Sequence, residues 1–210
     1  MNKRHTEIVF TLDRSGSMAS CRDATIEGFN RFLREQQAVP GRAKLTLVLF
    51  NNIVIAPFES IPVEETLPLT RRSYLPSGPT ALLDAIGSTI AALRARVKRL
   101  GPINRPPRVI VAILTDGHEN ASREYRWADV SAQIDERQRA GWTFLFLGAN
   151  QDAIATAARM NISAEHAANY VATPEGTRDA AATLSRTSSI LRQIDAETDA
   201  VDDSNESEEL

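Results

Sequence analysis

Residues 7–18 read EIVFTLDRSGSM. The first six are short, apolar and rich in β-branched side chains, which indicates a buried strand. The apolar run stops at Asp13, and Ser15 and Ser17 follow on a turn that Gly16 makes flexible. One carboxylate and two hydroxyls therefore come together directly after a predicted strand. All three are hard oxygen ligands of the kind that Mg²⁺ prefers.

Predicted strands and helices alternate along the rest of the chain. The further strands are 45–50, 53–58, 108–114, 143–147 and 169–172. The helices are 25–37, 81–100, 129–140, 152–160 and one that Pro174, behind Thr173 as N-cap, opens and that runs to about Ile194. This alternation predicts an α/β fold with a mostly parallel sheet. Asn51-Asn52 tolerates positive φ, so we expect a tight hairpin that adds one antiparallel edge strand. Residues 59–79 are expected to form a long surface loop.

The charge of the chain is unevenly distributed. Of the 27 acidic residues, eight lie from Asp195 onward, where there is no basic residue. The rest of the chain is mildly basic, and the acidic end lacks apolar periodicity, so we expect residues 194–210 to be a disordered tail. Cys21 is the one cysteine, which excludes an intramolecular disulfide. No stretch approaches the ~18 apolar residues of a membrane span, and the N-terminal apolar run is too short for a signal peptide. These features predict a soluble, cytoplasmic protein that does not bind membranes.

Two further segments offer oxygen ligands. The predicted strand 108–114 is followed by Thr115-Asp116-Gly117, and the loop before helix 81–100 ends in Gly78-Pro79-Thr80. In an open parallel sheet, ligands bind beyond the carboxyl ends of the strands, where these segments and the 13–17 turn can converge.

These residues resemble the von Willebrand factor A (VWA) domain, whose metal-ion-dependent adhesion site (MIDAS) has the pattern D-x-S-x-S, then a distant Thr, then a distant Asp. Asp13, Ser15, Ser17, Thr80 and Asp116 match this pattern in the family's order. Taken alone, Asp13, Ser15 and Ser17 are better explained as a turn acid and loop hydroxyls, and the matching Thr80 and Asp116 reverse this in favour of the metal site. The resemblance covers about residues 6–193, and the soluble bacterial and phage branch looks closest.

The resemblance implies a Rossmann-like, doubly wound sheet of six strands with helices on both faces. It also implies that Asp13, Ser15, Ser17, Thr80 and Asp116 hold Mg²⁺ or Mn²⁺, directly or through water, and leave one position for a carboxylate of a protein partner. Three neutral hydroxyls and at most two carboxylates leave a dication under-neutralised, so an outside Asp or Glu should bind well. Such domains act beside ATPases, chelatases or stress-response proteins.

Two other classes of function remain as alternatives to this binding module. A metal-dependent phosphohydrolase is the enzyme alternative, with His118 as its candidate base. However, aspartate-nucleophile phosphatases need a second Asp where Ser15 stands, so we expect no enzymatic activity. A scaffold in which the metal is only structural is the third class.

Several polar residues near the motif have ordinary alternatives. Asp84 either orients a ligand or stabilises the first turn of its helix. His118 and Glu119 are expected to be solvated loop residues. The basic run of residues 94–99 is expected to be a solvated helix face, and nucleic-acid binding is not expected.

Overall fold

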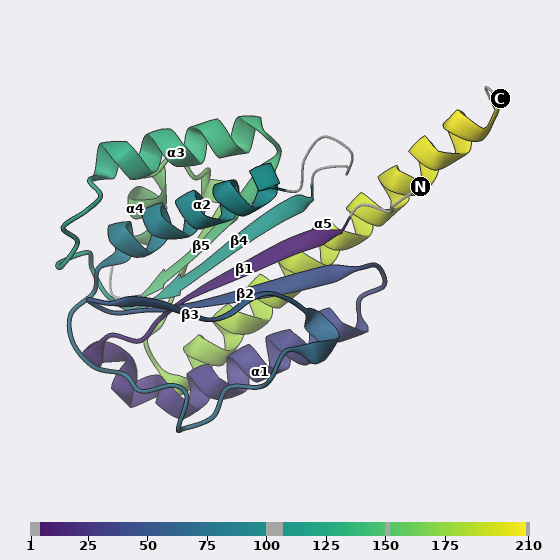
Figure 1. The fold of residues 1–210 in the computed structure, drawn as a ribbon. Helices are drawn as coiled ribbons and strands as arrows, with labels where there is room; N and C mark the ends of the chain where they lie inside the picture. Colours follow the sequence, from purple (N-terminus) through teal and green to yellow (C-terminus); the bar gives the residue numbers. More distant parts are fainter. Residues whose placement is uncertain (1–4, 100–106, 150–151, 209–210) are drawn as a thin grey trace.

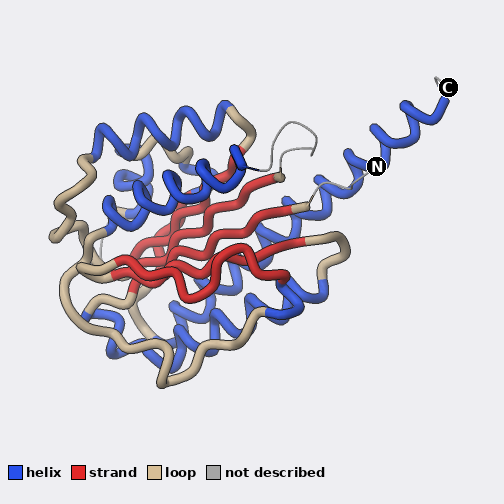
Figure 2. The backbone as a smooth tube through the Cα atoms, in the orientation of Figure 1, coloured by secondary structure: helices blue, strands red, loops and turns tan. Residues whose placement is uncertain are grey.

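The computed structural model describes residues 5–99, 107–149 and 152–208, with residues 195–208 described as backbone only. It contains one six-stranded sheet in the order β3-β2-β1-β4-β5-β6, shown in red in Figure 2. The strands are β1 (Thr6–Asp13), β2 (Ala43–Phe50), β3 (Val54–Pro62), β4 (Arg108–Thr115), β5 (Trp142–Ala149) and β6 (Ala167–Tyr170). All neighbouring strands are parallel except β2 and β3, which are antiparallel. The predicted doubly wound, mostly parallel α/β fold with one antiparallel edge strand is confirmed.

Helices cover both faces of this sheet (Figure 1). They are α1 (Arg22–Ala38), α2 (Leu82–Arg99), α3 (Trp127–Arg139), α4 (Ala153–Arg159) and α5 (Pro174–Glu208), and a short 3₁₀ helix, η1, spans Gly16–Cys21. α1 and α5 pack on one face, and α2, α3 and α4 pack on the other. None of the helices in the described part of the chain is long and apolar enough to cross a membrane.

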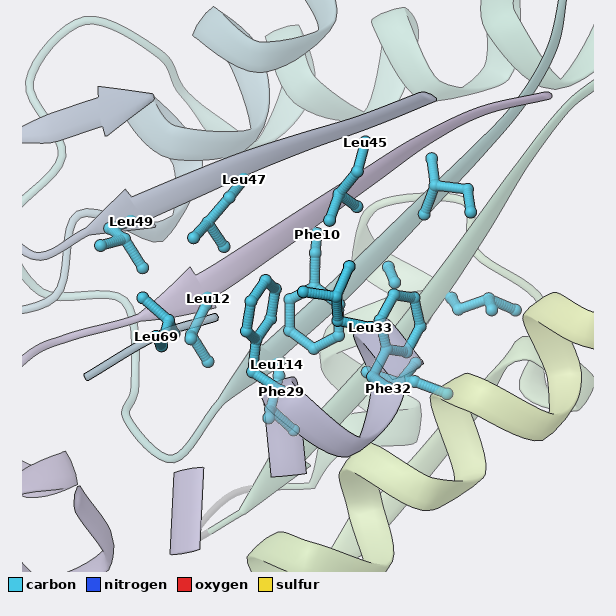
Figure 3. Close-up of a cluster of buried hydrophobic side chains, with 14 of the residues drawn as sticks. Phe10, Leu12, Phe29, Phe32, Leu33, Leu45, Leu47, Leu49, Leu69 and Leu114 are labelled. Atoms are coloured by element: carbon cyan, nitrogen blue, oxygen red, sulfur yellow. The ribbon is translucent and has the colours of Figure 1, made fainter. Parts of the chain in front are cut away.

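The two faces of the sheet build two hydrophobic cores, because successive residues of a strand point to opposite faces. Ile8, Phe10 and Leu12 of β1 face α1, whereas Val9 faces α2. Figure 3 shows aromatic and aliphatic side chains interlocking on the α1 face. The Phe10 ring lies edge-on to Phe32, with 4.8 Å between ring centroids. Burial on both faces explains why β1 and β4 are nearly continuous apolar runs.

The hairpin between β2 and β3 differs from the prediction. The strands are joined through Asn51, Asn52 and Ile53, with Phe50 paired to Val54. Neither asparagine has the expected positive φ. Asn51 is instead buried, with its Oδ1 accepting a hydrogen bond from the Ile53 amide at 2.9 Å. This side chain closes the turn by replacing a backbone partner, which is a common role of asparagine in loops.

The prediction that residues 59–79 form a long surface loop is wrong for part of the segment. Its first residues continue β3 to Pro62, and the side chains of Leu69 and Tyr74 are buried. The Tyr74 hydroxyl donates a hydrogen bond of 2.6 Å to the backbone carbonyl of Asp13, so burial of this polar tip is compensated. The loop is therefore anchored beneath the end of β1.

The last helix begins as predicted and ends later. Thr173 Oγ1 accepts a hydrogen bond from the Gly176 amide at 3.1 Å, which confirms the N-cap. The predicted end near Ile194 is wrong, because α5 continues to Glu208. The sequence contains no proline or glycine between residues 177 and 208 that would stop a helix. The division into a 6–193 domain and an acidic tail stays a prediction.

Candidate metal site

The candidate site lies where the sheet reverses its winding. β1 occupies the middle of the sheet, with β2 on one side and β4 on the other. The chain leaves β1 through α1 on one face and later leaves the β2–β3 hairpin through α2 on the other face. Asp13 is the last residue of β1, and Asp116 directly follows β4. Because Leu12 pairs with Leu114, the two strand ends are level, and both acids lie at the switch point between the strands.

Backbone hydrogen bonds join the loop after β1 to the loop before α2. The Gly16 amide donates to the Gly78 carbonyl at 2.8 Å, and the Ser77 amide donates to the Arg14 carbonyl at 2.8 Å. Gly78 has a φ of +75°, a backbone conformation that residues other than glycine rarely adopt. These contacts bring the segment that ends in Thr80 alongside the serine loop.

The side-chain oxygens of the predicted ligands gather at this point. Ser17 Oγ donates a hydrogen bond of 2.5 Å to Asp116 Oδ1, and Ser15 Oγ lies 3.1 Å from Ser17 Oγ. The Thr80 hydroxyl lies against Gly117, where a Cβ on the glycine would stand only 2.8 Å from Thr80 Oγ1. Residues from three distant segments therefore meet, as the sequence pattern predicted.

Burial controls the charge of the two acids. Asp13 is fully buried, and burial raises its pKa to about 6, although hydrogen bonds from Thr115 and Ser15 act in the opposite direction. The nearby charge of Asp116 raises the Asp13 pKa further. Burial also raises the pKa of Asp116, while the bond from Ser17 opposes this. Asp13 and Asp116 are thus two buried carboxylates whose like charges repel, which is unfavourable without a cation.

The donor set consists mainly of hydroxyl oxygens. Across the described ranges, no group of three or more His, Cys, Asp or Glu residues is placed to hold a metal. Any cation at this edge of the sheet would therefore depend on Ser15, Ser17 and Thr80 as well as on the two acids. Neutral and anionic oxygens together are the ligands that suit Mg²⁺ and Mn²⁺.

Sequence reasoning missed Thr115 and Tyr74. Thr115 Oγ1 donates a hydrogen bond of 2.6 Å to Asp13 Oδ2, and Tyr74 holds the backbone carbonyl of the same residue. Thr115 could have been found by aligning the ends of the two strands, because it directly follows the residue paired with Leu12. Tyr74 lies in a segment without periodicity, so no local signal indicated its burial.

Glu119 is not the solvated loop residue that was predicted. Its carboxylate accepts hydrogen bonds from the Leu83 amide at 2.9 Å and from the amides of Ala121 and Ser122. It therefore ties the loop after Asp116 to the first turn of α2, whose amides need such acceptors. The neighbouring His118 is exposed.

Asp84 also binds this loop rather than a candidate ligand. Its carboxylate accepts three backbone hydrogen bonds of 2.8–2.9 Å, from Arg123, Glu124 and Tyr125. Asp84 lies in the first turn of α2, as its predicted helix-stabilising role requires, and the structure adds a further role, which is anchoring of residues 123–125.

Solved structures with a similar fold were found, whereas sequence comparison found none. No family model and no curated protein sequence matches the chain. Proximal thread matrix protein 1 from the mussel byssus is 15% identical over 89% of this chain and 46% of that chain, with a TM-score of 0.61. A structure of the same mussel protein with a zinc-occupied MIDAS motif also has a TM-score of 0.61, at 14% identity. The manganese-loaded TRAP protein of Plasmodium vivax is 16% identical over 79% of this chain and 68% of that chain, with a TM-score of 0.56. A von Willebrand factor type A structure from Catenulispora acidiphila is 16% identical over 87% of this chain and 42% of that chain, also with a TM-score of 0.56.

These likenesses show that the chain has a VWA-type fold, as the resemblance implied. The chain spans about half the length of the mussel protein that it matches. At identities of 14–16%, the comparisons concern the fold alone, so the role of the site rests on its own residues.

Proposed function

We propose that this chain is a metal-dependent protein-binding module. Asp13, Ser15, Ser17, Thr80 and Asp116 hold a divalent cation, Mg²⁺ or Mn²⁺, and the cation takes a carboxylate from a protein partner. The observation that carries the proposal is the meeting of Ser15, Ser17 and Asp116 in one hydrogen-bonded row beside Asp13 and Thr80.

The residues fit a dication by their chemistry. Each of the five offers a hard oxygen, and the two carboxylates are buried near one another with raised pKa values. A divalent cation would offset both charges and favour their ionised forms. Two structural neighbours with bound metal support the proposal, because the mussel protein has a zinc-occupied MIDAS motif and the P. vivax protein is manganese-loaded.

The charge of the set favours an acidic partner. Three of the five ligands are neutral hydroxyls, so the two carboxylates are the charged ligands of the proposed cation. When bound, the cation supplies a positive centre at which an incoming Asp or Glu gains a charge-assisted contact. A partner Asn or Gln offers a neutral oxygen and binds more weakly. An ATPase or a stress-response protein in the cytoplasm is the kind of partner that we propose.

Binding is proposed rather than catalysis. Ser15 occupies the position at which an aspartate-nucleophile phosphatase carries its second acid, and Ser17 and Asp116 bond to each other. Neither arrangement supplies a base for the attack of water. A phosphatase assay with Mg²⁺ and Mn²⁺ should show no turnover above that of Asp13→Ala.

Partner capture tests the proposal. The full chain is immobilised with Mn²⁺, and retained proteins are compared with those retained in EDTA and by Thr80→Ala. Thr66→Ala is the matched control, because Thr66 is also buried but bonds to the Pro62 carbonyl away from the site. We expect loss of the partner in EDTA, weaker capture by Thr80→Ala and normal capture by the control. Changing the partner's acid to its amide should weaken capture, because the amide offers the cation only a neutral oxygen. Full capture in EDTA would show that recognition occurs on another surface.

A further inference from the structure

The residue that follows Glu119 holds the backbone of Thr80 from both sides. Asn120 Oδ1 accepts a hydrogen bond of 2.9 Å from the Thr80 amide. In return, the Thr80 carbonyl accepts hydrogen bonds from the amides of Asn120, at 3.0 Å, and Ala121, at 3.2 Å. A single residue thus pairs with both polar groups of the Thr80 peptide backbone, although the two lie 40 positions apart in the sequence.

The bonds between Asn120 and the Thr80 backbone are called the clasp below. Hydrogen bonds of the residues on either side of Asn120 hold the loop that carries it. Glu119 bonds to the Leu83 amide, and Ser122 Oγ accepts from the Asp84 amide at 3.0 Å. These bonds satisfy amides of the first turn of α2, so they hold the helix to the loop. They do not contact Thr80 itself. Within this network, Asn120 is the side chain that reaches the proposed ligand.

The Thr80 hydroxyl has little space around it. Thr80 is buried, and its Oγ1 faces Gly117, where even a methyl group would be too close. On its other side, the next residue is held by a bond from the Ala81 amide to the Asn51 carbonyl at 2.8 Å. Loss of the Asn120 side chain would leave the Thr80 carbonyl bonded but would release the Thr80 amide, so the peptide that joins Pro79 to Thr80 would be able to rotate and the hydroxyl would move relative to Asp116.

We propose that Asn120 is a positioning residue for the metal site: its clasp on the Thr80 backbone sets where the Thr80 hydroxyl stands relative to Asp116. This inference rests on the proposed function for its effect on metal binding. It does not depend on that function for its effect on Thr80. Residues that orient ligands in this way commonly change metal affinity by about 10- to 100-fold when they are removed.

A double-mutant cycle with Mn²⁺ as the probe tests the inference. Asn120→Ala should weaken Mn²⁺ binding by about 10-fold or more. It should have no further effect in a Thr80→Ala background, because it acts through Thr80. Equal Mn²⁺ affinity of Asn120→Ala and the unmodified chain would overturn the proposal, as would effects of the two substitutions that simply multiply.

Asn30 provides a matched control. Its side chain also clasps one distant residue, donating to the Leu69 carbonyl at 2.9 Å and accepting from the Leu69 amide at 2.7 Å. Asn30→Ala should lower thermal stability in the same way as Asn120→Ala and leave Mn²⁺ affinity unchanged. An equal loss of affinity in Asn30→Ala would show that the effect is one of general stability, and it would overturn the positioning role.

Amide hydrogen exchange separates this inference from the proposed function. If the unmodified chain binds no Mn²⁺, the proposed function fails, and the clasp is then judged without metal. The exchange rate of the Thr80 amide, followed by NMR, should rise in Asn120→Ala and stay unchanged in Asn30→Ala. An unchanged rate in Asn120→Ala would show that Asn120 does not hold Thr80.

Discussion

Asp13 is ionised at neutral pH at a cost to the stability of the fold. Burial raises its pKa from 3.8 to about 6, which corresponds to about 3 kcal/mol. The folded chain therefore binds the Asp13 proton more tightly than the unfolded chain does. Between about pH 4 and pH 6, the free energy of unfolding falls as the pH rises, and above pH 6 the full cost remains. The cation of the proposed site would offset this cost.

Replacing this charge should stabilise the metal-free protein. Asp13→Asn keeps the shape of the side chain and removes the buried charge, so in EDTA at pH 7 we expect the free energy of unfolding to rise by up to about 3 kcal/mol. The gain should shrink as the pH falls from about 6 to about 4 and should be absent below about pH 4, where Asp13 is protonated in both the folded and the unfolded chain. Urea unfolding across this pH range measures it, with the exposed Asp179→Asn as control. A loss of stability at every pH would contradict the account.

Thr115 should stabilise the ionised form of Asp13 through its hydrogen bond to the carboxylate. Thr115→Val keeps the branched shape and removes the hydroxyl that donates to Asp13 Oδ2. We expect stability at pH 7 in EDTA to fall by about 1–3 kcal/mol. Thr89→Val is the matched control, since the Thr89 hydroxyl is buried without a hydrogen-bond partner in the described structure and its removal should be neutral or stabilising. Equal losses in the two variants would refute a special role of Thr115.

At the scale of elements, periodicity predicted most strands and helices because their apolar residues face the two cores described above. It failed where a side chain replaced a backbone partner or reached a distant element. Asn51 closes its hairpin without positive φ. Tyr74 is buried and anchors a loop that has no regular periodicity. The end of α5 was missed because low hydrophobicity does not by itself stop a helix.

The contact between α1 and α5 depends on a glycine. A Cβ at Gly28 would stand 2.7 Å from Ala181 Cβ, closer than two methyl groups can approach. Gly28→Ala should therefore destabilise the protein by about 1–3 kcal/mol, despite the better helix propensity of alanine. The compensating double substitution Gly28→Ala/Ala181→Gly should recover much of the loss in thermal unfolding. If Gly28→Ala alone raises the unfolding temperature, the helices are not in this close contact.

For the whole molecule, the fold class and the five proposed ligands were accessible from sequence, because the motif residues directly follow strands whose ends must share one edge. The residues that hold these ligands in place were not accessible from the sequence. Thr115, Glu119 and Asn120 act through contacts with residues that are distant in sequence, and neither composition nor spacing marks them as different from ordinary loop residues.

The acidic end should be dispensable for folding. Figure 1 shows the end of α5 projecting beyond the sheet, and residues 195–210 contain eight acids and little apolar surface to bury. We expect a 1–194 chain to unfold within a few degrees of the full chain. A large drop in the unfolding midpoint would show that the acidic end packs on the body.

Calorimetric titration of Mn²⁺ into the full chain and into Asp13→Ala tests the central claim most directly. Asp13 is one of two carboxylates in the proposed ligand set, and circular dichroism of the variant controls for its fold. The account predicts one Mn²⁺ site in the unmodified chain, weakening as the pH falls through about 6 because protons compete for Asp13, and no binding by the folded variant. Unchanged binding in Asp13→Ala would contradict the assignment of the site.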